Sequence, residues 1–195
     1  MNKRFLLTPI TLILCGFLQM ANAQSTLTVQ PQNQADSTKV QPSDGAGKAV
    51  APTVSDEAMP DFTFTDHVTG KQMSLHEICR QNRYVLVDFW ASWCTPCRKE
   101  ITNFKVMHQI YKDRGFQIIS ISADAKEADW LKALEEEKLE WPNDIDGDKG
   151  ICKLFKVQFY PTVYLLDKDA HVIVSNDDAR GQRLRAKLAE LFLKP

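Results

Sequence analysis

The feature that constrains this chain most is an apolar run that leads directly into a Cys-x-x-Cys motif. Residues 85–90 are apolar apart from Asp88, and Cys94 and Cys97 follow after a short connection. A continuous apolar run of this length is typical of a central strand covered on both faces. Pro96 suits the first turn of a helix, because proline has a suitable φ there and no needed donor is lost. The sequence therefore predicts a strand followed by a helix that begins at Cys94.

The two cysteines are spaced to form a redox pair. The amino end of a helix presents unpaired N–H groups and about half a unit of positive charge, which favours a thiolate over a thiol. We therefore expect Cys94 to be the nucleophile and Cys97, one turn into the helix, to resolve the mixed disulfide. A zinc site would need a second Cys-x-x-Cys or closely spaced histidines, and the sequence contains neither. An inert structural disulfide is the other alternative.

The residues around the cysteines resemble a known family. The segment Asp-Phe-Trp-Ala-x-Trp-Cys-x-Pro-Cys, which ends at Cys97, resembles the active site of thioredoxins. The segment Cys-x-Pro-Cys-x-x-Glu, which ends at Glu100, is similar to the TlpA/ResA branch of extracytoplasmic thiol-disulfide oxidoreductases. The resemblance covers residues 59–195. It implies an α/β, thioredoxin-like fold with a central mixed sheet and helices on both faces.

A second motif supports the same resemblance. Tyr160 and Pro161 resemble the cis-proline loop that faces the disulfide in thioredoxin folds, so the resemblance implies a cis bond between them. It also implies that Trp93, Tyr160 and Pro161 contact the substrate. The implied activity is the reduction of disulfides in client proteins, without an organic cofactor or a metal. A membrane thiol-disulfide electron donor would reduce the protein again.

Two carboxyl groups are candidates for proton transfer. Asp88 is the only charged residue in an apolar strand, where an isolated charge is costly and is tolerated mainly where a raised pKa is useful. Glu100 lies three residues after Cys97 and hence on the same face of the helix. We therefore expect Asp88 and Glu100 to lie beneath the two cysteines and to handle the proton of Cys97.

Two other functions remain as alternatives. A peroxiredoxin-like peroxidase shares the fold, but it would be expected to have a lone peroxidatic cysteine preceded by threonine or serine in its own motif, which is missing. A non-catalytic protein of the same fold that binds copper or a client is the alternative from another class. Metal titration of the reduced protein would detect copper binding.

The N-terminal part of the chain predicts export. Residues 1–23 combine Lys3 and Arg4, an apolar run and a small-residue end, as a signal peptide does. We therefore expect a periplasmic or otherwise extracytoplasmic protein, with a retained anchor or lipidation at Cys15 as alternatives. Residues 24–58 have no aromatic residue and are expected to form a flexible linker. Without Lys3 and Arg4, 22 basic residues face 25 acidic ones, which gives no indication of nucleic-acid binding.

The pattern of apolar residues also predicts the elements of the domain at 59–195. Strands are expected at 61–65, 85–90, 116–122, 162–166 and 171–174, and helices at 74–83, 94–114, 127–138, 151–155 and 181–193. Residues 144–148 are expected to form a polar turn, and Leu191 is expected to be buried in the last helix. Cys79 and Cys152 are expected to be buried thiols, with a second disulfide as the alternative.

Overall fold

The computed structural model describes residues 58–193, and the predicted signal peptide and linker up to residue 57 lie outside them. The strands are β1 (Thr63–Thr65), β2 (Gln72–Ser74), β3 (Tyr84–Trp90), β4 (Phe116–Ser122), β5 (Asn143–Ile145), β6 (Thr162–Asp167) and β7 (Val172–Ser175). The α-helices are α1 (Leu75–Gln81), α2 (Thr95–Tyr111), α3 (Glu127–Glu137), α4 (Gly150–Leu154) and α5 (Gly181–Leu193). Two 3₁₀ turns, η1 (Lys112–Arg114) and η2 (Asn176–Ala179), complete the described part.

The main sheet is mixed and has β3 at its centre. Its strand order is β5-β4-β3-β6-β7, and a separate hairpin is formed by β1 and β2. The strand β3 is parallel to β4 and antiparallel to β6, while β7 closes the sheet as an antiparallel hairpin partner of β6. This arrangement confirms the predicted central mixed sheet, in which a parallel pair is extended by a hairpin.

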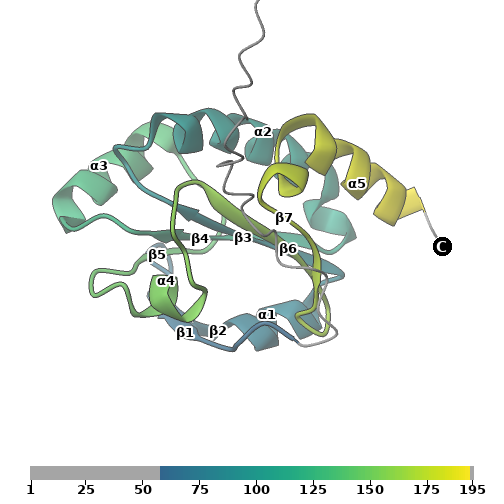
Figure 1. Cartoon of the computed structure of the whole chain (residues 1–195), viewed down its shortest axis with the longest axis horizontal. Helices are drawn as coiled ribbons and strands as arrows, with labels where there is room; N and C mark the ends of the chain where they lie inside the picture. Colours follow the sequence, from purple (N-terminus) through teal and green to yellow (C-terminus); the bar gives the residue numbers. More distant parts are fainter. Residues whose placement is uncertain (1–57, 194–195) are drawn as a thin grey trace, which may run out of the picture. The chain divides into compact units, whose positions relative to one another are not determined.

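Helices cover both faces of this sheet (Figure 1). The helices α2, α3 and α5 lie on one face and α1 and α4 on the other, as the two separate clusters of buried side chains require. Side chains alternate between the faces of a strand, so Leu86 and Trp90 of β3 point to the α2 face, whereas Val87 and Phe89 point to the α1 face. Asp88 therefore points to the α2 face.

Three details differ from the sequence predictions. The strand β2 was not expected, and β5 occupies part of the segment that was expected to be a polar turn. Asp144, one of the acidic residues that predicted a turn, lies within β5, and this segment is a strand because it pairs with β4. In α5 the side chain of Phe192 is buried, and Leu191 is only partly buried. None of the helices within residues 58–193 has the length and apolar character of a membrane span.

Candidate active site

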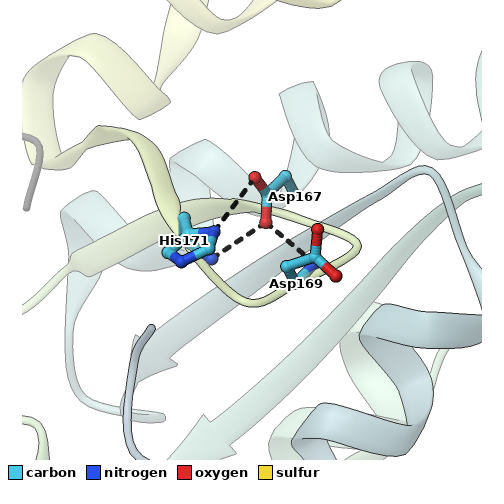
Figure 2. Close-up of side chains that lie close together, drawn as sticks. All are labelled: Asp167, Asp169 and His171. Carbon is cyan, nitrogen blue, oxygen red and sulfur yellow. Dashed lines mark hydrogen bonds and ion pairs between the residues drawn. The ribbon is translucent and has the colours of Figure 1, made fainter. Parts of the chain in front are cut away.

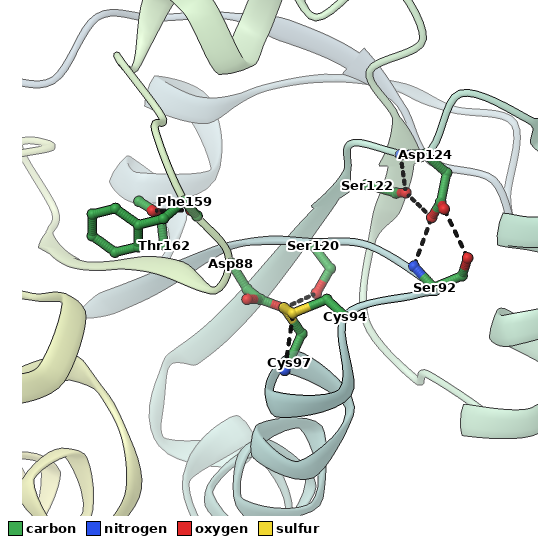
Figure 3. Close-up of a disulfide and its surroundings, with 9 residues drawn as sticks. All are labelled: Asp88, Ser92, Cys94, Cys97, Ser120, Ser122, Asp124, Phe159 and Thr162. Atoms are coloured by element: carbon green, nitrogen blue, oxygen red, sulfur yellow. Dashed lines mark hydrogen bonds between the residues drawn. A yellow bond between two sulfur atoms is a disulfide. The ribbon is translucent and has the colours of Figure 1, made fainter.

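The two cysteines lie where β3 ends and α2 begins, and they form a disulfide with an S–S distance of 2.02 Å (Figure 3). Cys94 is the N-cap residue of α2, and its Sγ accepts the backbone N–H of Cys97 at 3.2 Å. Both residues are buried, with exposed fractions of 4% for Cys94 and 2% for Cys97. This N–H at the helix N-terminus stabilises negative charge on Cys94 Sγ.

The connection between β3 and α2 is fastened to the end of β4 by a buried carboxylate. Asp124 accepts the backbone N–H of Ser92 at 2.8 Å and the Ser92 hydroxyl at 2.7 Å (Figure 3). The hydroxyl of Ser122 also donates to Asp124, at 2.6 Å. Hydrogen bonds to an ionised acceptor are among the stronger ones, so Asp124 fixes the segment that carries Trp93 and Cys94.

The predicted cis-proline loop lies next to this connection because β6 runs beside β3. Thr162, the first residue of β6, pairs with Phe89 near the end of β3. The bond between Tyr160 and Pro161 is cis, as predicted. The Thr162 hydroxyl donates to the carbonyl oxygen of Phe159 at 2.7 Å and so closes the loop around the proline.

An aromatic rim borders the disulfide. Trp93 is 65% exposed, and its ring meets the Tyr160 ring edge to face with centroids 5.8 Å apart. The Tyr160 hydroxyl donates to Cys152 Sγ at 3.7 Å, and burial raises the pKa of this tyrosine. Phe159 is also exposed. The rim therefore presents aromatic surface beside the redox pair. The hydroxyl end of the Tyr160 side chain is fixed by its contact with Cys152.

Asp88 is one of the residues around the disulfide (Figure 3). The residue is 1% exposed, and burial raises the pKa of its carboxyl group from 3.8 to about 7. The Ser120 hydroxyl donates to Oδ2 at 3.3 Å, whereas Oδ1 has no hydrogen-bond partner among the described residues. Asp88 is thus a buried acid that changes its protonation state near neutral pH.

Glu100 lies on α2 and connects this helix to the start of α5. Its Oε1 accepts the backbone N–H of Gly181 at 2.6 Å, and its Oε2 accepts the amide of Asn103 at 3.3 Å. The negative charge of Glu100 raises the pKa of Asp88, and the positive charge of Arg180 lowers it. Charges on α2 and just before α5 therefore act on Asp88 in opposite directions.

A comparison with protein families finds a match over most of the chain. Residues 55–175 match the AhpC/TSA family. The chain belongs to this family. The thiol-disulfide oxidoreductase ResA of Bacillus thuringiensis subsp. konkukian is 31% identical over 135 residues, which cover 69% of this chain and 75% of the relative.

Solved structures show the same similarity. The thioredoxin domain of a thiol-disulfide oxidoreductase from Bacteroides vulgatus superposes with a TM-score of 0.63 at 29% identity, over 70% of this chain and 96% of that one. A thiol-disulfide oxidoreductase from Bacteroides fragilis gives a TM-score of 0.61 at 28% identity, over 69% and 99%. This member of the AhpC/TSA family is a thiol-disulfide oxidoreductase with the thioredoxin fold.

The structure also adds residues that the sequence analysis did not select. Ser92 and Asp124 are 32 positions apart, and only the pairing of the strands brings them together. Ser120 could have been selected from the sequence, because Ser120 and Ser122 alternate with isoleucines in β4 and so share one face of the sheet. Trp141, whose indole N–H donates to Ser120, lies outside any predicted element.

The other two cysteines within residues 58–193 are reduced. Cys79 in α1 and Cys152 in α4 are both buried and free, so the alternative of a second disulfide is wrong. Burial raises the pKa of each thiol to about 12. A buried thiol that stays protonated is a poor nucleophile, so the thiol chemistry belongs to Cys94 and Cys97.

A group of side chains with metal-binding chemistry lies at the turn between β6 and β7 (Figure 2). The ligand atoms of Asp167, Asp169 and His171 lie within 4.8 Å of one another. Asp167 Oδ1 accepts the backbone N–H groups of Asp169 and His171, both at 2.9 Å. Asp169 in turn accepts from Lys168 Nζ at 2.6 Å. These contacts explain the group as the closure of the hairpin turn.

Proposed function

We propose that this enzyme is exported and reduces disulfides in client proteins through Cys94 and Cys97. The observation that carries the proposal is the position of Cys94, whose Sγ accepts a backbone N–H at the start of α2. The exposed rim and the cis-proline loop beside it offer an extended client segment a place to bind. Cys94 is therefore the sulfur that attacks the client.

The reaction has two exchanges. The Cys94 thiolate attacks one client sulfur, a mixed disulfide forms, and the other client sulfur leaves as a thiolate that takes up a proton. Cys97 then loses its proton and attacks Cys94 Sγ, and the first client sulfur leaves as a thiolate. Two electrons pass from the cysteine pair to the client, which ends as a dithiol. The enzyme ends with the disulfide between Cys94 and Cys97 that the structure shows.

Asp88 accepts the proton of Cys97 in the second exchange. Proton transfer is most effective when the pKa of the base lies near the working pH, and burial brings the pKa of Asp88 to about 7. Its Oδ1 has no other partner among the described residues, so this oxygen is available for the proton. Asp88 therefore combines a suitable proton affinity with a free oxygen.

Glu100 is the second acid of the site. Its two oxygens accept hydrogen bonds from Gly181 and Asn103, and its charge makes the carboxylate of Asp88 less stable. Glu100 thus supports proton uptake by Asp88 and keeps α2 and α5 in register. Trp93, Tyr160 and Pro161 contact the client, and a thiol-disulfide donor in the membrane returns electrons to the cysteine pair.

Trapping of the mixed disulfide tests this function. The full-length Cys97→Ser variant is reduced, freed of reductant and incubated with insulin, and the products are identified by non-reducing electrophoresis and mass spectrometry. We expect a covalent adduct through Cys94, whereas the matched Cys94→Ser variant forms none. Adduct formation by Cys94→Ser alone would contradict the assignment.

Export is tested separately. We expect the protein recovered from the periplasm of a Gram-negative expression host to begin at Gln24, after removal of the predicted signal peptide. N-terminal sequencing of the exported protein measures this directly. Recovery of the intact chain, with Met1, from the cytoplasm alone would contradict export.

A further inference from the structure

A chain of hydrogen bonds leads from Asp88 to a tryptophan behind the disulfide. Asp88 and Ser120 are direct neighbours across the parallel strands β3 and β4, so their side chains share the α2 face of the sheet. The Ser120 hydroxyl contacts Asp88 Oδ2 at 3.3 Å, and the indole N–H of Trp141 donates to Ser120 Oγ at 2.8 Å. All three side chains are buried.

The chemistry of the three groups sets the direction of this chain. An indole N–H can only donate, so the serine oxygen is the acceptor in the hydrogen bond between Trp141 and Ser120. The serine has a single hydroxyl proton, which then points to its other partner, Asp88 Oδ2. This series of hydrogen bonds therefore gives Asp88 Oδ2 one donor. Asp88 Oδ1 has no hydrogen-bond partner among the described residues.

We propose that Ser120 and Trp141 are positioning residues that set the proton affinity of Asp88 and leave Oδ1 as the oxygen that accepts the proton of Cys97. The proposal rests on the proposed function of Asp88. Trp141 orients the Ser120 hydroxyl, and the hydroxyl stabilises the carboxylate form of Asp88. Both residues act through Asp88 and not on the reacting sulfurs directly.

Opposing effects act on Asp88 in this position. Burial raises the pKa of its carboxyl group, and the hydrogen bond from Ser120 lowers it. The charged groups that act on it are Glu100 of α2, which raises the pKa, and Arg180 next to α5, which lowers it. His108 of α2 packs against the Trp141 ring with centroids 5.4 Å apart, and burial lowers its pKa, which favours the neutral imidazole. The hydroxyl of Ser120 thus offsets part of the burial effect.

The test is a titration of Asp88 by carbon NMR in oxidised, full-length protein with labelled aspartate carboxyl groups. Asp88→Asn identifies the resonance. We expect a midpoint near pH 7 in the parent protein and a midpoint about one pH unit higher in Ser120→Ala, because the carboxylate loses the hydroxyl donor to Oδ2. Trp141→Phe should raise the midpoint by a smaller amount, since the hydroxyl remains but is no longer oriented.

A double variant and a matched control make the test specific. In the Ser120→Ala background, Trp141→Phe should cause no further rise, because Trp141 acts only through the hydroxyl. Trp130→Phe is the control: this indole N–H is also buried but has no hydrogen-bond partner among the described residues. We expect it to leave the midpoint unchanged.

Three results would overturn the proposal: an unchanged midpoint in Ser120→Ala, an equal effect of Trp141→Phe with and without Ser120, or a shift in Trp130→Phe as large as that in Trp141→Phe. If Ser120→Ala does not fold, the proposal is decided by comparing the Asp88 midpoint of Trp141→Phe with that of Trp130→Phe. The titration needs no client and no turnover. A failure of Asp88 in catalysis would instead appear as an unchanged resolution rate in Asp88→Asn, so the two failures are distinguishable.

Discussion

Replacing Asp88 by asparagine should stabilise the oxidised protein at neutral pH and have little effect at acidic pH. The folded protein keeps the proton of Asp88 up to about pH 7, whereas the unfolded chain releases it near pH 3.8. Between these values the unfolded state binds fewer protons, so the stability of the parent protein falls as the pH rises. The variant has no such ionisable group and lacks this loss.

The magnitude follows from the raised pKa. A rise from 3.8 to about 7 corresponds to about 4 kcal/mol of unfolding free energy. The parent protein has this contribution in full below pH 3.8, loses it progressively as the pH rises, and has lost it above about pH 7. Urea unfolding of oxidised parent and Asp88→Asn proteins from pH 4 to 9 measures the difference. We expect the advantage of the variant to grow with pH and to level off near pH 8.

Asp113→Asn is the control for a general effect of charge, because Asp113 is exposed and lies in η1. Its unfolding free energy should differ from that of the parent protein by less than about 0.5 kcal/mol throughout. A constant difference between Asp88→Asn and the parent protein across this pH range would refute the burial argument, because no proton release would then accompany unfolding at this site.

Two further predictions concern the disulfide segment. Brief treatment of reduced protein with iodoacetamide at mildly acidic pH should label Cys94 before Cys97, because only Cys94 Sγ caps α2; mass spectrometry measures the ratio, and preferential labelling of Cys97 would contradict the assignment. Asp124→Asn should lower the unfolding free energy by about 1–3 kcal/mol and slow the attack of Cys94 on a small disulfide, because the hydrogen bonds from Ser92 to a charged acceptor are weakened. Urea unfolding measures the free energy, and the rate of reaction with the small disulfide measures the attack by Cys94. If neither value changes, Asp124 does not position the segment that carries Cys94.

Much of the fold follows from local patterns in the sequence. The apolar run before Cys94 predicted β3, and Pro96 placed the start of α2 correctly. The elements that were missed are short: β2 and β5 have three residues each, and their pairing with neighbouring strands, rather than their own composition, makes them strands. Such strands depend on tertiary context that a local pattern does not contain.

The residues of the site also fall into those that the sequence predicted and those that it did not. Asp88 was predictable because a single charge in an apolar strand is unusual, and the cis bond before Pro161 followed from resemblance. Asp124 and Trp141 were not predictable, because their partners Ser92 and Ser120 are 32 and 21 positions away. Residues that act through another side chain leave no motif of their own, so the structure was needed to find them.

The most direct test of the account is the rate at which Cys97 resolves a preformed mixed disulfide at Cys94, measured by stopped flow across pH. We expect the parent rate to rise with a midpoint near pH 7, and Asp88→Asn to lower it at least about tenfold and to remove that midpoint, while the initial attack by Cys94 is unchanged. Glu100→Gln should have a smaller effect, because Glu100 acts on Asp88 through its charge. Resolution rates that are unchanged in both variants would contradict the assignment of the proton to Asp88.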